Sequence, residues 1–466
     1  MTGSGVRFLF AAACAIALAG TSAPAPAAGT DLLRAAEQMD NGRLEKLLQG
    51  GADPDGASDY GVTALHVACE NRDDRAVRLL LDAGADPNAA TWSGETVLMH
   101  CARTGATASV RALLEAGADP HAAERRKSQT ALMWAAAHGH AGAVRVLLEG
   151  GADITARSSD GFTPLLFAAR SGDVATARAL VDAGADPDEA TPEHGTTLVV
   201  AAAGGHEELA LYLLEQGASA DAADAGGITA LHHAVAAGMA ALNGVRYDPV
   251  YRVIPDNHHA LAAALLEAGA DPDRPIEKAR RLGPDGSPFE MEGMTPFLLA
   301  AVSADVELLG LFRVHEANPN VVAKGGTTAL IAAARAACTG ACAFSAGGNR
   351  GDEAAVRRAL EAVEAILAMG ADIEAKNEDG QTALHMAAFT GSDPIVKLLA
   401  ERGADVNVTD NYGQTPWSMA SGISPVLRYR GLYGDHRTTV ALLENLGATS
   451  TTREAMDPNA PPPPGQ

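Results

Sequence analysis

Histidine and cysteine are the side chains that most often hold metals or carry redox chemistry, and this chain of 466 residues contains 14 His and 5 Cys. The pairs His232-His233 and His258-His259 would each supply two zinc ligands. No Cys or acidic residue follows either pair at a spacing typical of a zinc site. We therefore expect no metal site.

The cysteines form no recognised motif. Cys338 and Cys342 make a C-x-x-x-C pattern without a following His, which fits neither a haem attachment nor a thioredoxin-like site. We expect these two to form a short disulfide that pins a loop. Cys69 and Cys101 stand where the sequence otherwise places alanine, and we expect them simply to fill space in the core.

The remaining chemistry-bearing residues do not assemble into a catalytic set. The segment GGNRGDE, which contains Arg350-Gly351-Asp352, lacks the glycine spacing of a phosphate-binding loop. No nucleophile occurs together with a base and an acid at a recognisable spacing. We therefore expect neither an enzyme nor a cofactor.

The start of the chain is typical of a secretory signal peptide. Arg7 precedes a short apolar run, and Ala25-Pro26-Ala27 follows as a small-residue cleavage site. We expect residues 1–27 to be removed and the protein to be exported, to the periplasm or outside the cell. Lipid attachment at Cys14 is an alternative. The apolar run is too short for an integral membrane span.

The charge balance restricts the partners. The formal net charge is −23, whereas nucleic acids need a cationic surface. We therefore expect no nucleic-acid partner. Hydrophobic residues make up 47% of the chain and aromatic residues 4%, so the core is built from small side chains.

One phrase recurs along the chain. A Thr, usually within G-x-T-x-L, returns about every 33 residues, and a Gly-Ala-Asp phrase follows about 21 residues after it. The recurring threonines are Thr63, Thr96, Thr130, Thr163, Thr196, Thr229, Thr295, Thr328, Thr382 and Thr415.

Each period predicts a turn followed by two short helices. The Thr can cap the first helix, and Pro164, directly after Thr163, suits a first helical position. Gly84 suits the left-handed residue after the second helix, and Asp160-Gly161 suits a tight turn. One such unit is too small to bury its own apolar face, so neighbours must stack.

These features resemble the ankyrin repeat, whose period is 33 residues. The segments "GVTALHVACENRDDRAVRLLLDAGADPNAA" and "GQTALHMAAFTGSDPIVKLLAERGADVNV" are close to that family's consensus. The resemblance implies an all-α solenoid of about eleven helix-turn-helix repeats over residues 31–449, followed by a Pro-rich disordered tail at 450–466. It is also similar to the secreted ankyrin-repeat proteins of bacteria. In this family the His of T-x-L-H, here His66, His232 and His385, hydrogen-bonds within the turn framework.

The period is interrupted in three repeats. The usual 21 residues between the Thr and the Gly-Ala-Asp glycine become about 40, 42 and 32 in repeats 7, 9 and 11. The extra residues fall between the two helices of each repeat, so we expect insertion loops on one edge. Those of repeats 7 and 11 are rich in Tyr and Arg, which often carry interface energy. An alternative is that these Tyr anchor the loops. The residues are Tyr247, Tyr251, Arg252, Arg428, Tyr429 and Tyr433.

A second candidate surface follows from the resemblance. Ankyrin proteins generally bind partners on a concave face formed by turn tips and first helices. Aligned on the repeat, the basic and aromatic residues on that face suit an acidic partner. These are Tyr60, Trp92, Arg103, Arg126, Lys127 and Arg170, with Tyr412 and Phe389 in the C-terminal repeats.

We expect a monomeric protein-protein interaction scaffold or adaptor in the cell envelope. It would bind another protein through the concave face, the Tyr/Arg loops, or both. Two alternatives remain open. The loops could bind a small molecule or metal as an accessory to an exported enzyme, or the solenoid could be a structural envelope spacer.

Overall fold

The computed structural model describes residues 28–235, 259–278, 292–336, 353–422 and 436–450. It contains two compact units, Met1–Asp119 and Pro120–Gln466. The predicted signal peptide and most of the predicted tail lie outside the described residues. Among the described residues, no helix has the length and apolar character needed to cross a bilayer.

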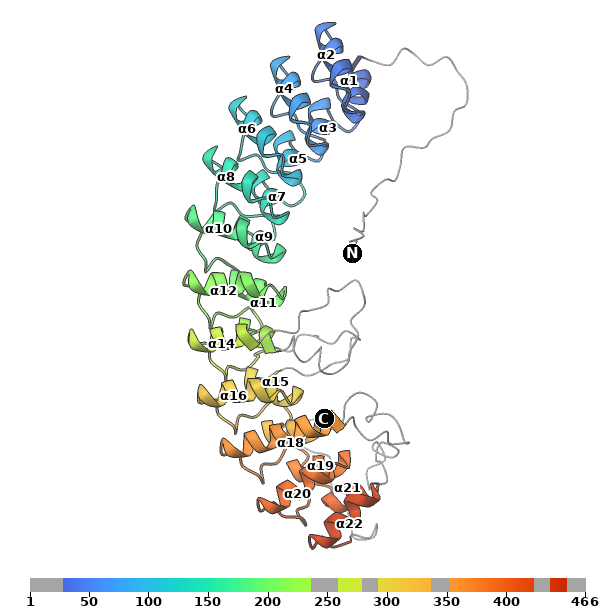
Figure 1. Cartoon of the computed structure of the whole chain (residues 1–466), viewed down its shortest axis with the longest axis vertical. Helices are drawn as coiled ribbons and strands as arrows, with labels where there is room; N and C mark the ends of the chain where they lie inside the picture. Colours follow the sequence, from blue (N-terminus) through green and yellow to red (C-terminus); the bar gives the residue numbers. More distant parts are fainter. Residues whose placement is uncertain (1–27, 236–258, 279–291, 337–352, 423–435, 451–466) are drawn as a thin grey trace, which may run out of the picture. The chain divides into compact units, whose positions relative to one another are not determined.

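The first unit contains three helix pairs, whose members lie in two rows (Figure 1). Helices α1, α3 and α5 pack side by side in one row, and α2, α4 and α6 pack in the other. The bounds are α1 Ala28–Glu37, α2 Asn41–Gln49, α3 Ala64–Glu70, α4 Asp74–Asp82, α5 Val97–Thr104 and α6 Thr107–Glu115.

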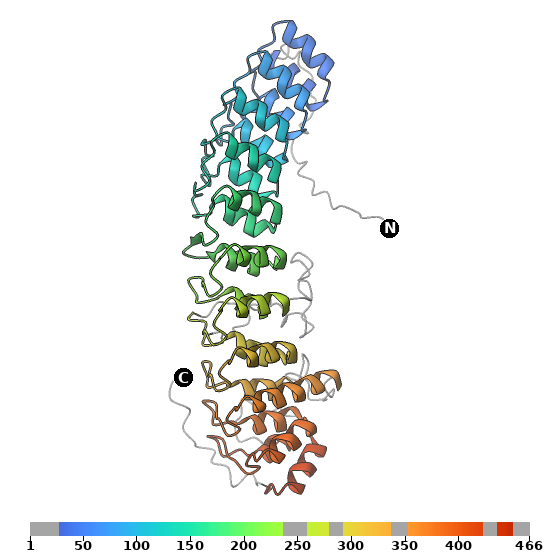
Figure 2. The same cartoon turned by 60° about the vertical axis from the view of Figure 1, so that its left-hand side comes forward.

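The second unit repeats this plan, and its turns lie along one edge of the helices (Figure 2). The helices nearer its N-terminal end are α7 Ala131–Ala137, α8 Ala141–Glu149, α9 Pro164–Ser171, α10 Val174–Asp182, α11 Thr197–Ala203, α12 Glu207–Glu215 and α14 His259–Glu267. Those that follow are α15 Pro296–Ser303, α16 Val306–Val314, α17 Ala329–Arg335, α18 Glu353–Ala368, α19 Ala383–Thr390, α20 Asp393–Glu401, α21 Pro416–Ala420 and α22 Arg437–Asn445.

The prediction of an all-α repeat solenoid is confirmed, with one small exception. The strands β1 (Ala190–Thr191) and β2 (Gly195–Thr196) form a short antiparallel hairpin in one of the turns. Helix α18 also departs from the pattern, because it has 16 residues where α16 and α20 have nine.

From α3 onward, the recurring Thr precedes the first helix of a pair, as predicted. Thr163 has extended backbone angles, and its hydroxyl accepts a hydrogen bond from the N–H of Leu166 at 3.3 Å. Pro164 occupies the first helical position, where its missing N–H costs nothing. Gly172 ends α9 in the left-handed conformation, with φ of 76°. A Cβ there would lie 2.3 Å from His206, so only glycine fits.

Three histidines add a bridge between repeats to the Thr cap. The Thr382 N–H donates to Nδ1 of His385 at 3.1 Å, and Nε2–H of His385 donates to the Gln414 carbonyl of the next turn at 3.1 Å. His66 and His232 make the same pair of contacts. Burial lowers the pKa of these imidazoles to about 4. The predicted structural role of these histidines is confirmed.

A ladder of hydrogen bonds links consecutive turns within each unit. In each rung, a side-chain oxygen of one turn accepts a backbone N–H of the next turn at 2.7–3.2 Å. The rung from Asp86 N to Asp55 Oδ1 joins residues 31 apart in sequence. The rungs at Asp271, Asp372 and Thr449 join residues 50, 52 and 42 apart. The stack therefore stays in register where the chain between two turns is longer.

The interpretation of Cys69 and Cys101 as core filler is wrong. Their Sγ atoms form a disulfide, with Cα atoms 4.6 Å apart, and both residues are fully buried between α3 and α5. Close packing of these small-residue helices brings the two Cα atoms within disulfide range. The predicted pair Cys338 and Cys342 lies outside the described residues.

We predict that removing this disulfide destabilises the first unit. Cys69→Ala with Cys101→Ala should lower the unfolding free energy by about 2–4 kcal/mol, since the bond closes a 32-residue loop. Calorimetry would measure the change in a Cys338→Ala, Cys342→Ala background. Free alkylation of both thiols in the unreduced protein would contradict the bond itself.

We also predict that the buried histidines make the fold acid-sensitive. Their folded pKa of about 4 lies below the ordinary 6.5, so between pH 6.5 and 4 the unfolded chain binds more protons. Stability should therefore fall as the pH is lowered through this window. His385→Gln should make that fall shallower in urea unfolding, whereas the same change at exposed His138 should not. Equal slopes in all three proteins would show that His385 contributes nothing.

Candidate functional site

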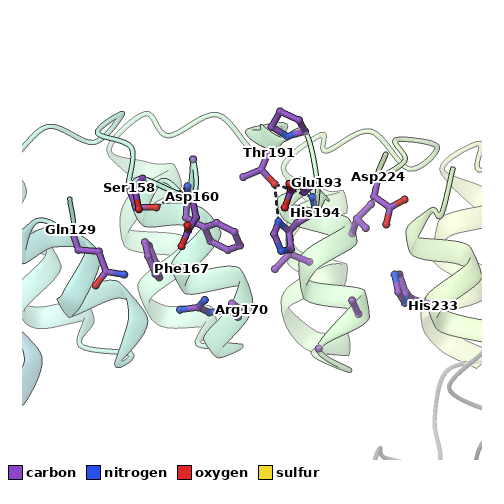
Figure 3. Close-up of a pocket in the computed structure, with 18 residues that line it drawn as sticks. Gln129, Ser158, Asp160, Phe167, Arg170, Thr191, Glu193, His194, Asp224 and His233 are labelled. Carbon is purple, nitrogen blue, oxygen red and sulfur yellow. Dashed lines mark hydrogen bonds between the residues drawn. The ribbon is translucent and has the colours of Figure 1, made fainter. Parts of the chain in front are cut away.

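The clearest cavity among the described residues is an open groove of about 840 Å³ in the second unit. Its walls come from α9, the β1–β2 hairpin and α11, with the turn at Asp224 and His233 at one end. Figure 3 shows the turn residues along one edge of the groove and the helix residues Arg170 and His233 along the other.

The α9 side of the groove is built on two phenylalanines. Phe162 precedes the Thr163 cap and Phe167 lies one helical turn further on, so their rings meet with centroids 5.4 Å apart. Both rings are almost fully buried. The ring of His194, in the hairpin, packs against Phe162 with centroids 5.1 Å apart. The backbone N–H of His194 donates to Thr191 Oγ1 at 3.0 Å. These contacts fix the two sides of the groove relative to each other.

Arg170 lies over this aromatic pair. Its Cζ atom is 4.9 Å from the centroid of Phe167 and 5.3 Å from that of Phe162, a distance typical of cation–π stacking. The side chain is exposed. Within the described part of the chain, its guanidinium has no ion-pair or hydrogen-bond partner. Five N–H donors are therefore held by the rings and remain available to a ligand.

The turn edge of the groove is acidic. Asp160 is exposed and pairs with Lys127 at 2.8 Å, and Glu193 is exposed at the hairpin tip. Asp224 is buried and accepts N–H groups of its own turn from Gly226 at 2.7 Å and Ile228 at 3.1 Å. The groove thus carries negative charge along its turns and positive charge on α9.

The predicted residues of the first unit form two separate groups. Tyr60 and Trp92, at neighbouring turn tips, have ring centroids 6.3 Å apart and exposed fractions of 65% and 71%. Arg103 instead shares the Glu70 carboxylate with His100. Burial alone would raise the pKa of Glu70, but the hydrogen bonds from His100 and Arg103 outweigh it and lower the pKa. Arg103 is therefore engaged within its own unit.

In the second unit, only part of the predicted surface is brought together. Arg170 lies in the groove, and Lys127 contacts its edge through Asp160. Arg126 is exposed on the turn that precedes α7. Tyr412 lies in a turn, as expected, but it is only 9% exposed and its hydroxyl donates to Asp379 at 3.3 Å, so it offers little surface to a partner.

The six Tyr and Arg residues predicted for the insertion loops lie outside the described residues: Tyr247, Tyr251, Arg252, Arg428, Tyr429 and Tyr433. No metal site emerges either, because no three His, Cys, Asp or Glu side chains cluster suitably among the described residues.

Sequence reasoning missed Phe162, Phe167 and His194. One signal was available for Phe162, since the position before the repeat Thr is aromatic only there. The corresponding residues in three other repeats are Val62, Gln129 and Gln381. His194 carried no such signal, because it reaches Phe162 only through the stacking of two turns.

The chain matches two family models, and both describe ankyrin repeats. The model of three ankyrin copies matches residues 32–124, 120–191 and 353–429, about half of the chain. The model of many ankyrin copies matches residues 198–243.

Three curated relatives are similar over shorter stretches. B-cell lymphoma 3 protein homolog of Mus musculus is 32% identical over 207 residues, 43% of this chain and 38% of the relative. Ankyrin repeat and SOCS box protein 16 of Mus musculus is 36% identical over 127 residues, 27% of this chain and 25% of the relative. The Transient receptor potential cation channel subfamily A member 1 homolog of Caenorhabditis elegans is 32% identical over 126 residues, 27% of this chain and 9% of the relative.

The chain therefore spans well under half the length of each of these relatives. With the helix pairs, capping threonines and turn ladder described above, the family-model matches assign its repeats. The chain belongs to the ankyrin-repeat family.

Proposed function

We propose that this protein is a non-enzymatic interaction scaffold that binds a partner protein in the groove between α9 and α11. The observation that carries the proposal is Arg170, an exposed guanidinium held on two rings without an ion-pair partner among the described residues. Ankyrin repeats generally mediate protein-protein interaction, which supports a protein rather than a small molecule as ligand.

The groove is well suited to binding because its walls are already fixed. The hairpin is tied to α9 by the contact between His194 and Phe162, and α11 begins at the Thr196 cap. A wall that does not reorganise loses little conformational entropy when a partner docks. The exposed Pro192 and Ala203 add apolar surface between the charged edges.

We predict that filling the groove abolishes binding without unfolding the protein. Ala203 is exposed at the end of α11 and lines the groove, so Ala203→Arg places a long side chain in it. The matched control is Ala183→Arg, at the exposed end of α10 and outside the groove. Partners crosslinked in extracts of the native cell should be lost with Ala203→Arg and retained with Ala183→Arg. Equal recovery with both variants, at unchanged melting temperature, would place binding elsewhere.

We further propose that the protein is exported, in the manner of secreted bacterial ankyrin-repeat proteins, and works in the periplasm or outside the cell. The buried Cys69–Cys101 disulfide supports this setting, because disulfides persist in oxidising compartments. The signal-like residues 1–27 provide separate support from the sequence.

We predict that the mature protein begins near Ala28. Mass spectrometry of the native protein should find its first residue between about Pro24 and Thr30, since cleavage follows a small-x-small site. A cytoplasmic protein that retains Met1 would contradict the proposal.

A further proposal concerns how the repeats are arranged along the chain. We infer about eleven repeats, with extra residues in repeats 7, 9 and 11. Support comes from the ladder, in which four rungs are longer than the regular 31 residues. Three of them join residues 50, 52 and 42 apart, that is 19, 21 and 11 more than 31, and the rung from Asp273 to Asn318 joins residues 45 apart. The Tyr/Arg residues of these segments stay a predicted second binding surface.

A further inference from the structure

We infer that the groove between α9 and α11 selects a peptide segment of its partner with three features: a carboxylate for Arg170, a large apolar side chain beside it, and a Lys or Arg toward the turns. This inference rests on the proposed function and names the chemistry of the partner. It follows from the positions of one cation, two carboxylates and an apolar gap.

The carboxylate of the peptide is inferred from Arg170. Some arginines of the chain are held by its own carboxylates. Arg274, for example, binds Asp221 at 2.6 Å, and Arg43 binds Asp31 at 3.3 Å. Arg170 instead lies over Phe162 and Phe167, with Cζ 5.3 and 4.9 Å from their centroids. No ion pair or hydrogen bond within the described residues occupies its guanidinium, so the donor edge remains available to a ligand. That edge matches a carboxylate in two parallel hydrogen bonds.

The apolar side chain is assigned by the floor of the groove. Ala203 and Gly204 are exposed where α11 ends, and neither fills the space beside Arg170. Val200 is half-buried and Pro192 is exposed on the hairpin, so the surface around the gap is largely apolar. The two phenylalanines are only 5% and 3% exposed, and they support Arg170 rather than contact the ligand.

The Lys or Arg of the peptide is inferred from the acidic residues along the turn edge of the groove. Asp160 and Glu193 are exposed there, on the turns before α9 and α11 (Figure 3). Lys127 pairs with Asp160 at 2.8 Å, so Glu193 leaves this edge with net negative charge, which disfavours a uniformly acidic segment there. A segment with its acid toward the helices and its base toward the turns satisfies both edges. The charge pattern therefore fixes the orientation of the peptide as well as its composition.

The test begins with selection of a random 12-residue peptide library on the exported full-length protein. We expect the enriched peptides to share an acidic residue next to a large apolar residue, with Lys or Arg further along. A synthetic peptide of the consensus is then titrated by fluorescence anisotropy. Arg170→Ala should weaken its binding about tenfold or more, and Arg170→Lys should weaken it less.

The matched control is Arg178→Ala. Arg178 is also exposed and also stacks on a ring, with Cζ 4.4 Å from the centroid of Tyr212, but it does not line the groove. The Arg178→Ala variant loses a similar cation–π contact, and its affinity for the peptide should be unchanged. Replacing the acidic residue of the peptide by its amide should weaken binding to the wild-type protein as much as Arg170→Ala does. The same replacement should not weaken binding to the Arg170→Ala variant any further.

Four outcomes would count against the inference or its basis. Enriched peptides without a shared acid, or an affinity indifferent to Arg170→Ala but abolished by Ala203→Arg, would overturn the inference and leave the proposed function standing. Binding that survives Ala203→Arg, or no enriched peptide at all, would instead count against the groove as the binding site.

Discussion

The side-chain oxygen that accepts a backbone N–H from the next turn is the contact on which this structure depends. A single helix pair cannot bury its apolar face, so each pair is stable only in a defined position against its neighbours. Apolar packing between Ala-rich helices is weakly directional, whereas the rung from Asp188 Oδ1 to Ser219 N sets one alignment. The buried histidines add a second bridge, from His385 to Gln414 for example.

The groove is a product of that alignment. Phe162 and His194 belong to different turns, and they meet because the turns are held a fixed distance apart. Arg170 is then supported from below by rings of its own repeat. The same stacking that stabilises the unit thus prepares a cationic edge and an acidic edge in advance of any partner. The proposed binding site and the stability of the unit therefore depend on one set of contacts.

Local features of the fold could be predicted from the sequence, and contacts between repeats could not. Thr163, Pro164 and Gly172 act within one helix, so their residue types were sufficient. Cys69 lies six residues after its Thr and Cys101 five after its own, a difference of about 100° around a helix, which an alignment by period does not evaluate. Arg170 was found by its place in the repeat. The rings that support it, and its lack of an ion pair within the described residues, could be seen only in the structure.

The disulfide between α3 and α5 gives the first unit an unusual response to mechanical force. A repeat stack pulled at its ends unravels one pair at a time, because each pair is held mainly by its neighbours. The chain between Cys69 and Cys101 cannot be extended while the disulfide is intact, so about 110 Å of contour length does not contribute to the extension of the unfolded chain. Under a force applied to the N-terminal end, the loop closed by the disulfide would therefore not extend. The force would be transmitted through the disulfide to the repeats that follow.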